Sequence, residues 1–411
     1  MRGSAGGRAG ARFDLVRTSA AMPVSDPDST GNHPPARILA AILRILLTGW
    51  IALTAACAHT EHHRVVYHLG PPLCKEGPPV WTASDGRQLM YRRWGPMGAT
   101  PRAVVVAIPG WNATAGDIEP LAHYLAARGI CVYSSGVRGQ HGDLTAKAHH
   151  AKGDIPDGRL WTRDYCEFAQ WVGSQYPRTP LFLYGQSMGA LTVLTAADSP
   201  GIVEGGQLRG VILHSPAVAM IYAPQPVRSF IGAMRGLYGT RLLFTVGLIP
   251  GDKPALTSNP RFDLVWGLSV DRVRPGFTWR FLDEAMKLGE RARDAAAHLR
   301  APVLVLTGDK DPIGTAGVGQ HGFSALMKSI PSPDKERVRF PDGYHDLIHD
   351  KNQQVAMECV GGWMDRQITA RNGPPTASAS GAPRDTAVQA KSDTFKNASV
   401  RENASAAASG E

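Results

Sequence analysis

The sequence contains few cysteines, 5 in 411 residues. Apart from Cys57, they show neither the C-x-x-C spacing of a redox motif nor a zinc-binding pattern. Those four cysteines are Cys74, Cys131, Cys166 and Cys359. We expect them to be buried free thiols, and a disulfide is the alternative if the protein is exported.

Charge is also sparse, since Asp, Glu, Lys and Arg make up 19% of the residues. The net charge is +9, of which residues 57–371, with 34 basic and 28 acidic side chains, carry +6. This mild excess contains no Lys/Arg run with interleaved aromatics, so we expect no nucleic-acid partner. Attraction to anionic lipid remains open.

The apolar run near the N-terminus, Ile45–Cys57, is too short to span a bilayer, which takes about twenty residues. Arg37 and Arg44 precede it, as in a signal peptide. We therefore expect residues 37–57 to be a signal peptide or a membrane anchor; an apolar helix on the domain is the alternative. Translation starting at Met22 would shorten the stretch before this segment.

The apolar run ends in "LTAAC", which resembles the lipobox of bacterial lipoproteins. In such proteins, signal cleavage leaves an acylated cysteine, here Cys57. The match is imperfect because Thr54 stands where an apolar residue is expected, with Leu53 one place further back. We expect an exported protein that is membrane-associated through its N-terminus or periplasmic, with inner-membrane anchoring as the alternative.

The two ends of the chain differ in composition from the middle. Residues 1–36 and 372–411 are rich in small residues and proline and show no apolar periodicity, so we expect both to be disordered. Residues 58–371 are left as the folded domain.

Six short apolar runs in this domain predict strands buried on both faces, which requires a sheet covered by helices on both sides. The runs lie at 104–108, 130–134, 181–185, 211–215, 302–307 and 337–340. Helical periodicity lies between or after them at 116–129, 162–177 and 352–368, with Asp117 placed to cap the first helix and Gly129 to end it. The alternation predicts an α/β fold with a mostly parallel, doubly wound sheet.

The alternation is interrupted once, between residues 215 and 302, by stretches of helical type. We expect a helical cap insertion at about 221–298. Its apolar stretch at 242–249 suits an acyl pocket or a membrane contact, and ordinary helix packing explains it equally well.

The strand at 181–185 leads into G-x-S-x-G, formed by Gly185, Gln186, Ser187, Met188 and Gly189. By chance, this pattern would occur in about one such chain in three, so its context decides. A strand, a tight turn and a helix "MGALTVLTAA" make a nucleophile elbow, in which the serine is exposed at the strand end. The sequence therefore predicts Ser187 as the nucleophile.

A serine nucleophile needs a base and an acid that orients the base. Asp311 follows the strand at 302–307, and His345 follows the strand at 337–340, in the order Ser, Asp, His. We expect these two residues to complete a triad, with Asp309 as the weaker candidate for the acid. Asp342 and Asp346 are expected to be solvated loop acids.

Acyl transfer also needs donors to the oxyanion. The amide of Met188 is one candidate, because it directly follows the nucleophile. The other lies after the strand at 104–108, at Trp111 or Asn112, of which we favour Trp111. An aromatic side chain lining the pocket floor is the alternative role for Trp111.

Histidines gather in two stretches without the acids and spacing of a metal site, so we expect no metal and no cofactor. They are His59, His62, His63, His68, His149 and His150.

Six segments together resemble the monoacylglycerol lipase, lysophospholipase and serine aminopeptidase-like branch of the α/β-hydrolases. They read "WTASDGRQLMYRRWGP", "VVVAIPGW", "LFLYGQSMGA", "VILHSPAV", "PVLVLTGDKDPI" and "FPDGYHDLIHD", within residues 78–368. The resemblance implies the α/β-hydrolase fold, a Ser187, Asp311 and His345 triad, oxyanion amides at Trp111 and Met188, and a cap.

The chain departs from the family pattern at three places. Pro109 stands where His usually precedes the glycine, Gln186 stands where His is frequent, and Gly136 stands where an aspartate often opens the loop after the second strand. These departures affect the shape of the pocket and the anchoring of loops, so they bear on the substrate and leave the triad intact.

The leading hypothesis is a serine hydrolase that cleaves a lipid-like or other acyl ester through an acyl-enzyme. A serine aminopeptidase is the alternative, and it requires cap acids to hold the substrate ammonium. Its candidates are Asp252, Asp263, Glu284 and Glu290. A third hypothesis is a non-catalytic scaffold that binds a partner. The oligomeric state is not predicted.

Overall fold

A computed structural model of the chain describes residues 79–96, 98–145, 152–203, 206–244, 256–262, 273, 276–370 and 384–388. The chain divides into two units, Met1–His63 and Arg64–Glu411, and every described residue belongs to the second. The predicted signal or anchor segment with Cys57, the N-terminal extension, Cys74 and both histidine-rich stretches lie outside the described residues.

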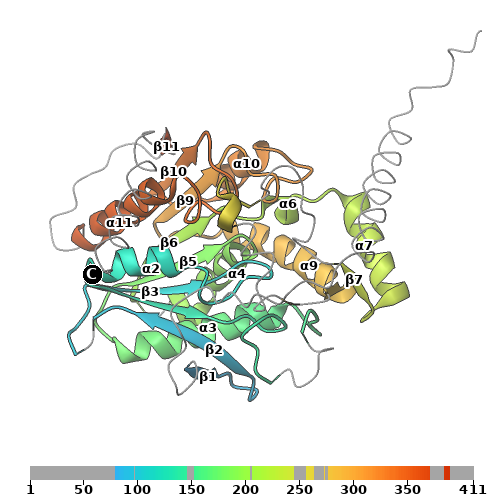
Figure 1. Cartoon of the computed structure of the whole chain (residues 1–411), viewed down its shortest axis with the longest axis horizontal. Coiled ribbons are helices and arrows are strands. Elements are labelled where there is room, and N and C mark those ends of the chain that lie inside the picture. Colours follow the sequence, from blue (N-terminus) through green and yellow to red (C-terminus); the bar gives the residue numbers. More distant parts are fainter. Residues whose placement is uncertain are drawn as a thin grey trace, which may run out of the picture. The chain divides into compact units, whose positions relative to one another are not determined.

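The described residues form a nine-stranded mixed sheet with helices on both faces, which confirms the predicted α/β class (Figure 1). The strand order is β1-β2-β4-β3-β5-β6-β9-β10-β11. The first two pairings, β1 with β2 and β2 with β4, are antiparallel, and the others are parallel. The strands are β1 (Val80–Thr82), β2 (Gln88–Trp94), β3 (Ala103–Ile108), β4 (Ile130–Ser135), β5 (Leu181–Gln186), β6 (Leu208–His214), β9 (Val303–Gly308), β10 (Lys335–Phe340) and β11 (Arg384–Ala387).

All six strands predicted from apolar runs are present, as β3, β4, β5, β6, β9 and β10. Alternate residues of β3, β4, β5, β6 and β9 enter two separate cores, as the period of two requires, whereas β10 contributes to one of them. On one face they pack with α2 and α11, and on the other with α3, α4, α9 and α10. The helices are α2 (Glu119–Ala126), α3 (Arg159–Gln175), α4 (Met188–Ala197), α5 (Pro200–Val203), α6 (Val218–Ile221), α7 (Gln225–Tyr238), α9 (Trp279–Ala296), α10 (His321–Ser329) and α11 (Gln353–Thr369).

The helix predicted at 116–129 is α2, but the prediction that Asp117 caps it is wrong. The N-cap residue is Ile118, whose side chain makes no capping hydrogen bond. The Asp117 carboxylate instead accepts a hydrogen bond from the hydroxyl of Thr114, at 2.8 Å. Gly129 adopts the positive φ, 74°, expected of a glycine that follows a helix.

The stretch predicted as a cap, about 221–298, divides into parts with different surroundings. Its last helix, α9, packs against α4 and supplies side chains to the core on that face of the sheet. Helix α7 packs against α9 on the side away from the strands (Figure 1). Two short strands, β7 (Leu242–Phe244) and β8 (Phe277–Thr278), pair antiparallel; β7 follows α7 and β8 leads into α9.

The tail predicted to be disordered contains a short strand, β11. It pairs in parallel with β10, with Arg384 opposite Glu336, and its four side chains are exposed. A strand held by its backbone needs no apolar pattern, so the composition of the tail gave no sign of it. The disorder expected for residues 372–411 therefore does not extend to Arg384–Ala387.

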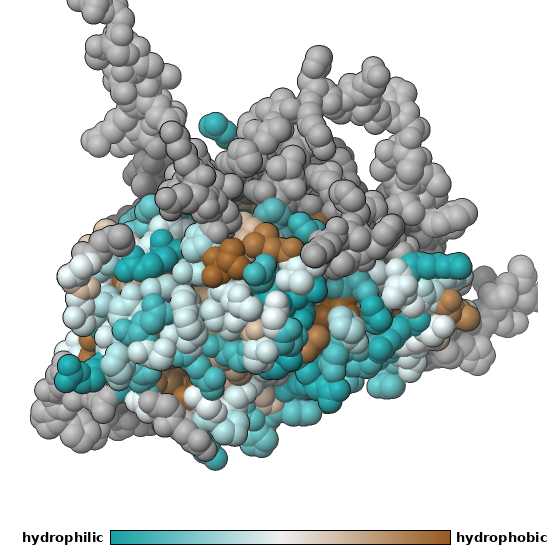
Figure 2. Space-filling view, turned by 90° about the horizontal axis from the view of Figure 1, so that it is seen from below, coloured by the Kyte–Doolittle hydropathy of each residue, from teal (hydrophilic) through white to brown (hydrophobic). Residues whose placement is uncertain are grey.

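The described cysteines Cys131, Cys166 and Cys359 are free thiols. Among the described residues, no helix combines the length and apolarity needed to cross a membrane. The face drawn in Figure 2 is largely hydrophilic, with apolar residues in small patches.

Candidate active site

Ser187 occupies a strained turn between β5 and α4. Its φ of 55° and ψ of −119° lie in a region that a residue with a side chain rarely adopts, as in a nucleophile elbow. A Cβ on Gly189 would lie 2.5 Å from the carbonyl oxygens of both Ile108 and Pro109, and a Cβ on Gly185 would collide with the backbone of Gly189. The two glycines are therefore required by the close approach of β3, β5 and α4.

The parallel strands place their carboxyl ends at one edge of the sheet, where ligands of open α/β sheets bind. Ser187 follows β5, Asp311 follows β9 and His345 follows β10 at this edge. Helix α4 begins at Met188, so its N-terminus, where negative charge is stabilised, adjoins the serine.

The imidazole of His345 is hydrogen-bonded to Asp311, with 2.8 Å between Nδ1 and Oδ2, and both side chains are buried. The other carboxylate oxygen, Oδ1, accepts the amides of Ile313 at 2.9 Å and Gly314 at 2.8 Å. Because Nδ1 carries the proton shared with the carboxylate, the nitrogen of the neutral ring that can accept a proton is Nε2.

Burial and charge act in opposite directions on this pair. Burial by itself would lower the pKa of His345, but the charge of Asp311 and its hydrogen bond outweigh burial, so the pKa lies above its ordinary value of 6.5. Burial would likewise raise the pKa of Asp311, but His345 and the two amides hold it below its ordinary value. The pair favours an imidazolium next to a carboxylate, the form that a general base reaches during catalysis.

The other acids near the strand ends have partners of their own. Asp309, the weaker candidate for the orienting acid, pairs with Arg339 at 2.7 Å. Asp342 pairs with Lys310 at 2.8 Å and is partly exposed, in agreement with the expected solvated acid. Among the acids of the described residues, the geometry selects Asp311 as the partner of the histidine.

The expectation that Asp346 is a solvated acid is wrong, because this side chain is only 5% exposed. Its carboxylate is bonded to Nδ1 of His349 at 2.9 Å, and its amide donates to the carbonyl of Leu256 at 2.7 Å. The ring of Phe262 stacks on His349 with 3.9 Å between centroids. A segment of the insertion thus covers the loop that carries His345.

The two predicted oxyanion donors lie beside Ser187. A Cβ on Gly110 would be 3.0 Å from Cβ of the serine, so the backbone leading to Trp111 passes directly against it. The amide of Asn112, the other candidate, donates to the side chain of Gln140. Among the described residues, no acceptor is bonded to the amide of Trp111 or of Met188. Trp111 is therefore the better candidate of the two.

The side chain of Trp111 packs against the insertion. Its ring centroid lies 5.2 Å from that of Phe277 and 5.0 Å from that of Phe281. The side chain of Asn112, which has a positive φ of 54°, accepts the amide of Val273 at 2.7 Å. The loop with the candidate oxyanion donor is thus held by residues from the stretch between β6 and β9.

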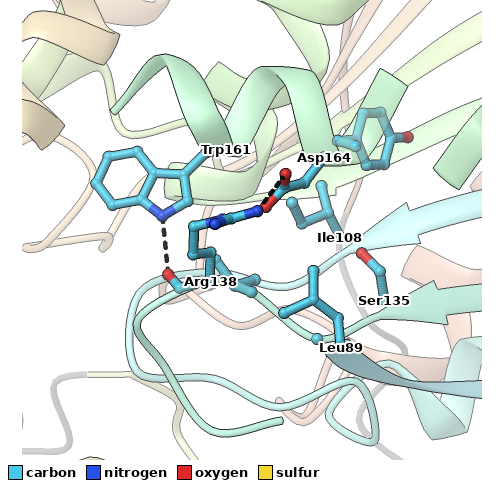
Figure 3. A pocket seen from close by; sticks show the side chains of 9 residues that line it. Leu89, Ile108, Ser135, Arg138, Trp161 and Asp164 are labelled. Atoms are coloured by element: carbon cyan, nitrogen blue, oxygen red, sulfur yellow. Dashed lines mark hydrogen bonds and ion pairs between the residues drawn. The ribbon is translucent and has the colours of Figure 1, made fainter. Parts of the chain in front are cut away.

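The loop after β4 is anchored by a buried ion pair that the sequence did not reveal (Figure 3). Arg138 donates to Asp164 of α3 from Nε at 2.6 Å and from Nη2 at 2.9 Å, and the indole of Trp161 donates to the Arg138 carbonyl at 3.0 Å. The cavity beside this pair measures about 10 Å³, about the space of one water molecule. The anchor positions Gln140, two residues further along, which accepts the Asn112 amide.

Gly136, which stands where the family often has an aspartate, lies against β2. Its amide donates to the carbonyl of Met90 at 2.6 Å, and a Cβ would be 2.9 Å from the same oxygen. No side chain fits there without a shift of the strand. The departure from the family pattern therefore reflects the packing of this loop onto β2.

Two polar residues beside the site were missed in the sequence. His214 ends β6 and accepts the Ser187 amide through its carbonyl at 2.9 Å, and Gln140 supports the oxyanion loop. The only signal for His214 was a histidine inside the apolar run "VILHS". Within the described part of the chain, no group of three or more metal-ligating side chains gathers.

Comparisons with known proteins show the family of the chain. Residues 99–352 match the family Hydrolase_4, described as "Serine aminopeptidase, S33". The human monoglyceride lipase is 28% identical over 274 residues, covering 66% of this chain and 84% of the relative. A monoacylglycerol lipase of Mycolicibacterium smegmatis is 26% identical over 281 residues, covering 68% and 93%.

The fold is shared with solved structures as well. A soluble variant of the monoglyceride lipase of Saccharomyces cerevisiae superimposes with a TM-score of 0.58 at 19% identity, covering 73% of this chain and 98% of the other. The family match and the relatives identify the protein as a hydrolase of the lipase and esterase type. The chain belongs to the Serine aminopeptidase, S33 family, within the α/β-hydrolase superfamily.

Proposed function

We propose that this protein cleaves carboxylic esters of lipid type, with monoacylglycerols as the substrate class, through a Ser187, His345 and Asp311 triad. The observation that carries the proposal is the buried Asp311–His345 hydrogen bond of 2.8 Å at the sheet edge where Ser187 stands in its elbow. The names of the relatives, monoglyceride and monoacylglycerol lipases, support the substrate class.

In the first half of the reaction, Nε2 of His345 takes the proton of the Ser187 hydroxyl while its oxygen attacks the ester carbonyl. The amides of Trp111 and Met188 donate to the resulting oxyanion, and each such donor lowers the barrier by about 3 kcal/mol. Collapse of the intermediate breaks the ester bond. The imidazolium, stabilised by Asp311, then gives its proton to the leaving alcohol.

In the second half, water attacks the acyl-enzyme. His345 takes a proton from the water, a second tetrahedral intermediate forms in the same oxyanion hole, and its collapse releases the carboxylic acid. The proton returns to Ser187, so the enzyme is regenerated and the ester is hydrolysed with no cofactor.

The competing function is that of a serine aminopeptidase, which needs free acids for the substrate ammonium. Two of the four candidate acids have cationic partners: Glu284 accepts from Arg235 at 2.8 Å, and Glu290 pairs with Arg228 at 2.9 Å. Asp252 and Asp263 lie outside the described residues. The pairing of Glu284 and Glu290 favours the ester substrate.

A panel of nitrophenyl acyl esters and monoacylglycerols of rising chain length, assayed beside amino-acid anilides, tests the proposal. We expect turnover of the esters, none of the anilides, and no activity in Ser187→Ala. Turnover of anilides alone would establish the aminopeptidase. A folded wild-type protein that a fluorophosphonate does not label at Ser187 would instead indicate a non-catalytic scaffold.

For location, we propose that the protein is exported and anchored by lipid on Cys57, which would bring the domain close to membrane lipids. The support is the "LTAAC" run after a short apolar segment. Mass spectrometry of the mature N-terminus tests this, and an unmodified residue upstream of Cys57 would refute lipidation.

A further inference from the structure

His214 is a fully buried polar residue at the carboxyl end of β6, with no exposed surface. Its carbonyl accepts the amide of Ser187 at 2.9 Å. Its Nε2 accepts the amide of Leu347, two residues after His345, at 3.1 Å. Its Nδ1 lies 2.7 Å from the hydroxyl of Tyr184 in β5. One residue therefore contacts both the elbow and the loop of the proposed catalytic histidine.

This position matters because β5 and β10 are not neighbours. In the sheet, β6 and β9 lie between them. The carboxyl end of β5, which Ser187 follows, and that of β10, which the loop with His345 follows, are therefore three strand spacings apart, about 14 Å. The loop after β10 must return across the ends of β9 and β6 to bring His345 to the serine. Something must hold it there.

Besides the His345–Asp311 bond and the contact with Leu256, the loop is attached to the neighbouring strand ends by hydrogen bonds at its start and further along. At its start, the amide of Lys310 after β9 donates to the carbonyl of Gly343 at 3.0 Å. Further along, the bond from the Leu347 amide to His214 attaches it to the end of β6. In the register of the sheet, His214 lies opposite Gln186, the residue before the nucleophile. The second of these attachments is thus the one adjacent to the elbow.

The hydrogen bonds also determine the tautomer of His214. Since Nε2 accepts an amide proton, it is unprotonated, and the neutral ring must carry its proton on Nδ1. Nδ1 then donates to the hydroxyl oxygen of Tyr184, which burial keeps protonated by raising its pKa well above the ordinary value. Burial lowers the pKa of His214 to about 4, so the ring is neutral near pH 7.

We propose that His214 is a positioning residue for the hydrolytic reaction. It sets the separation of Ser187 and His345, because its carbonyl binds the elbow and its Nε2 binds the loop that carries His345. The inference rests on the proposed function, in which Ser187 and His345 react with each other. His214 acts through these two residues and does not contact the reacting atoms.

The decisive comparison is between His214→Gln and His214→Asn in the full chain. The side-chain amide of glutamine reaches the place of Nε2 and can accept the Leu347 proton, whereas that of asparagine ends near the place of Nδ1. A shift of about 1 Å in a reacting group lowers the rate about a hundredfold. We therefore expect kcat to fall about a hundredfold in His214→Asn and less than tenfold in His214→Gln, with KM within about twofold in both.

Two further variants guard against misfolding of the first pair. Tyr184→Phe leaves the imidazole in place but removes the acceptor of its proton, so kcat should fall about tenfold. Tyr165→Phe is the matched control, since this buried hydroxyl donates to the carbonyl of Val106 in β3, at 2.8 Å. It should lose similar thermal stability with kcat unchanged.

The rate at which a fluorophosphonate labels Ser187 should fall in parallel with kcat in the series. Equal kcat and labelling rates in folded His214→Asn and His214→Gln would overturn the inference, and so would a Tyr184→Phe effect no larger than that of Tyr165→Phe. Failure of the proposed function is distinguishable, because the wild-type protein would then hydrolyse no ester, or its ester hydrolysis would survive Ser187→Ala.

Discussion

The role of Asp311 can be tested by replacing it with asparagine, which keeps the shape of the side chain. Oδ1 of the carboxylate accepts two amides, from Ile313 and Gly314, so the single oxygen of asparagine must take that place. Its NH₂ group then faces Nδ1 of His345. Because two donors cannot face each other, Nδ1 becomes the acceptor and the ring proton moves to Nε2, where it blocks proton abstraction from Ser187.

A triad histidine held in the wrong tautomer loses about 10⁴ in kcat, equivalent to about 5.5 kcal/mol of barrier. We expect this loss in Asp311→Asn with KM nearly unchanged, and a decrease of about 1 to 3 kcal/mol in the free energy of unfolding from the lost charge-assisted bond. The assay is hydrolysis of a short nitrophenyl ester, with urea unfolding alongside.

The matched control is Asp309→Asn, two residues away. That carboxylate pairs with Arg339 at the surface, so kcat should stay within about twofold of wild type. If a folded Asp311→Asn protein kept kcat within about tenfold of wild type, Asp311 would not orient the base. If the control lost as much as Asp311→Asn, the acid would have been assigned to the wrong residue.

Three other predictions follow from the same geometry. The neutral form of His345, which acts as the base, forms as the pH rises through its pKa. Because this pKa lies above 6.5, kcat/KM should reach half its maximum above pH 6.5. A midpoint below that value in a pH–rate profile would contradict the shift. Gly189→Ala places a Cβ 2.5 Å from two backbone oxygens and should reduce the free energy of unfolding in urea by about 1 to 3 kcal/mol. The control Gly362→Ala, whose Cβ would have nothing within 4 Å, should be neutral or stabilising in the same assay. Arg138→Leu leaves Asp164 buried without its main cation and should lower the free energy of unfolding by about 3 to 5 kcal/mol. The double variant Arg138→Leu/Asp164→Leu should recover part of this loss. If the single variant were as stable as wild type, the pair would not be an anchor.

Much of the fold could be predicted from the sequence, because its signals are local. Each central strand is a run of consecutive apolar residues, and burial on both faces follows from that pattern. The elbow is similarly local: a strand, two glycines and a helix lie within seventeen residues, 181–197. The order Ser187, Asp311 and His345, each just after a predicted strand, then placed three candidate residues at one edge of the sheet.

Other features could not be predicted, because they depend on contacts between distant segments. Asp346 was expected in solvent, yet Leu256 of the insertion, 90 residues earlier, covers its loop. Strand β11 is held by backbone pairing with β10, which no side-chain pattern signals. Whether α9 belongs to a cap or to the layer on the sheet was likewise decided by its packing against α4.

The sequence by itself determined the class of fold, the elbow serine and the candidates for base and acid, because consecutive residues encode strands, helices and tight turns. Only the tertiary structure decided that Asp311 rather than Asp309 meets His345, and that the amide of Asn112 is occupied by Gln140. It also decided that His214 joins the two loops of the site. A hydrogen bond depends on where two side chains meet in space, and the spacing of residues along the chain does not contain that information.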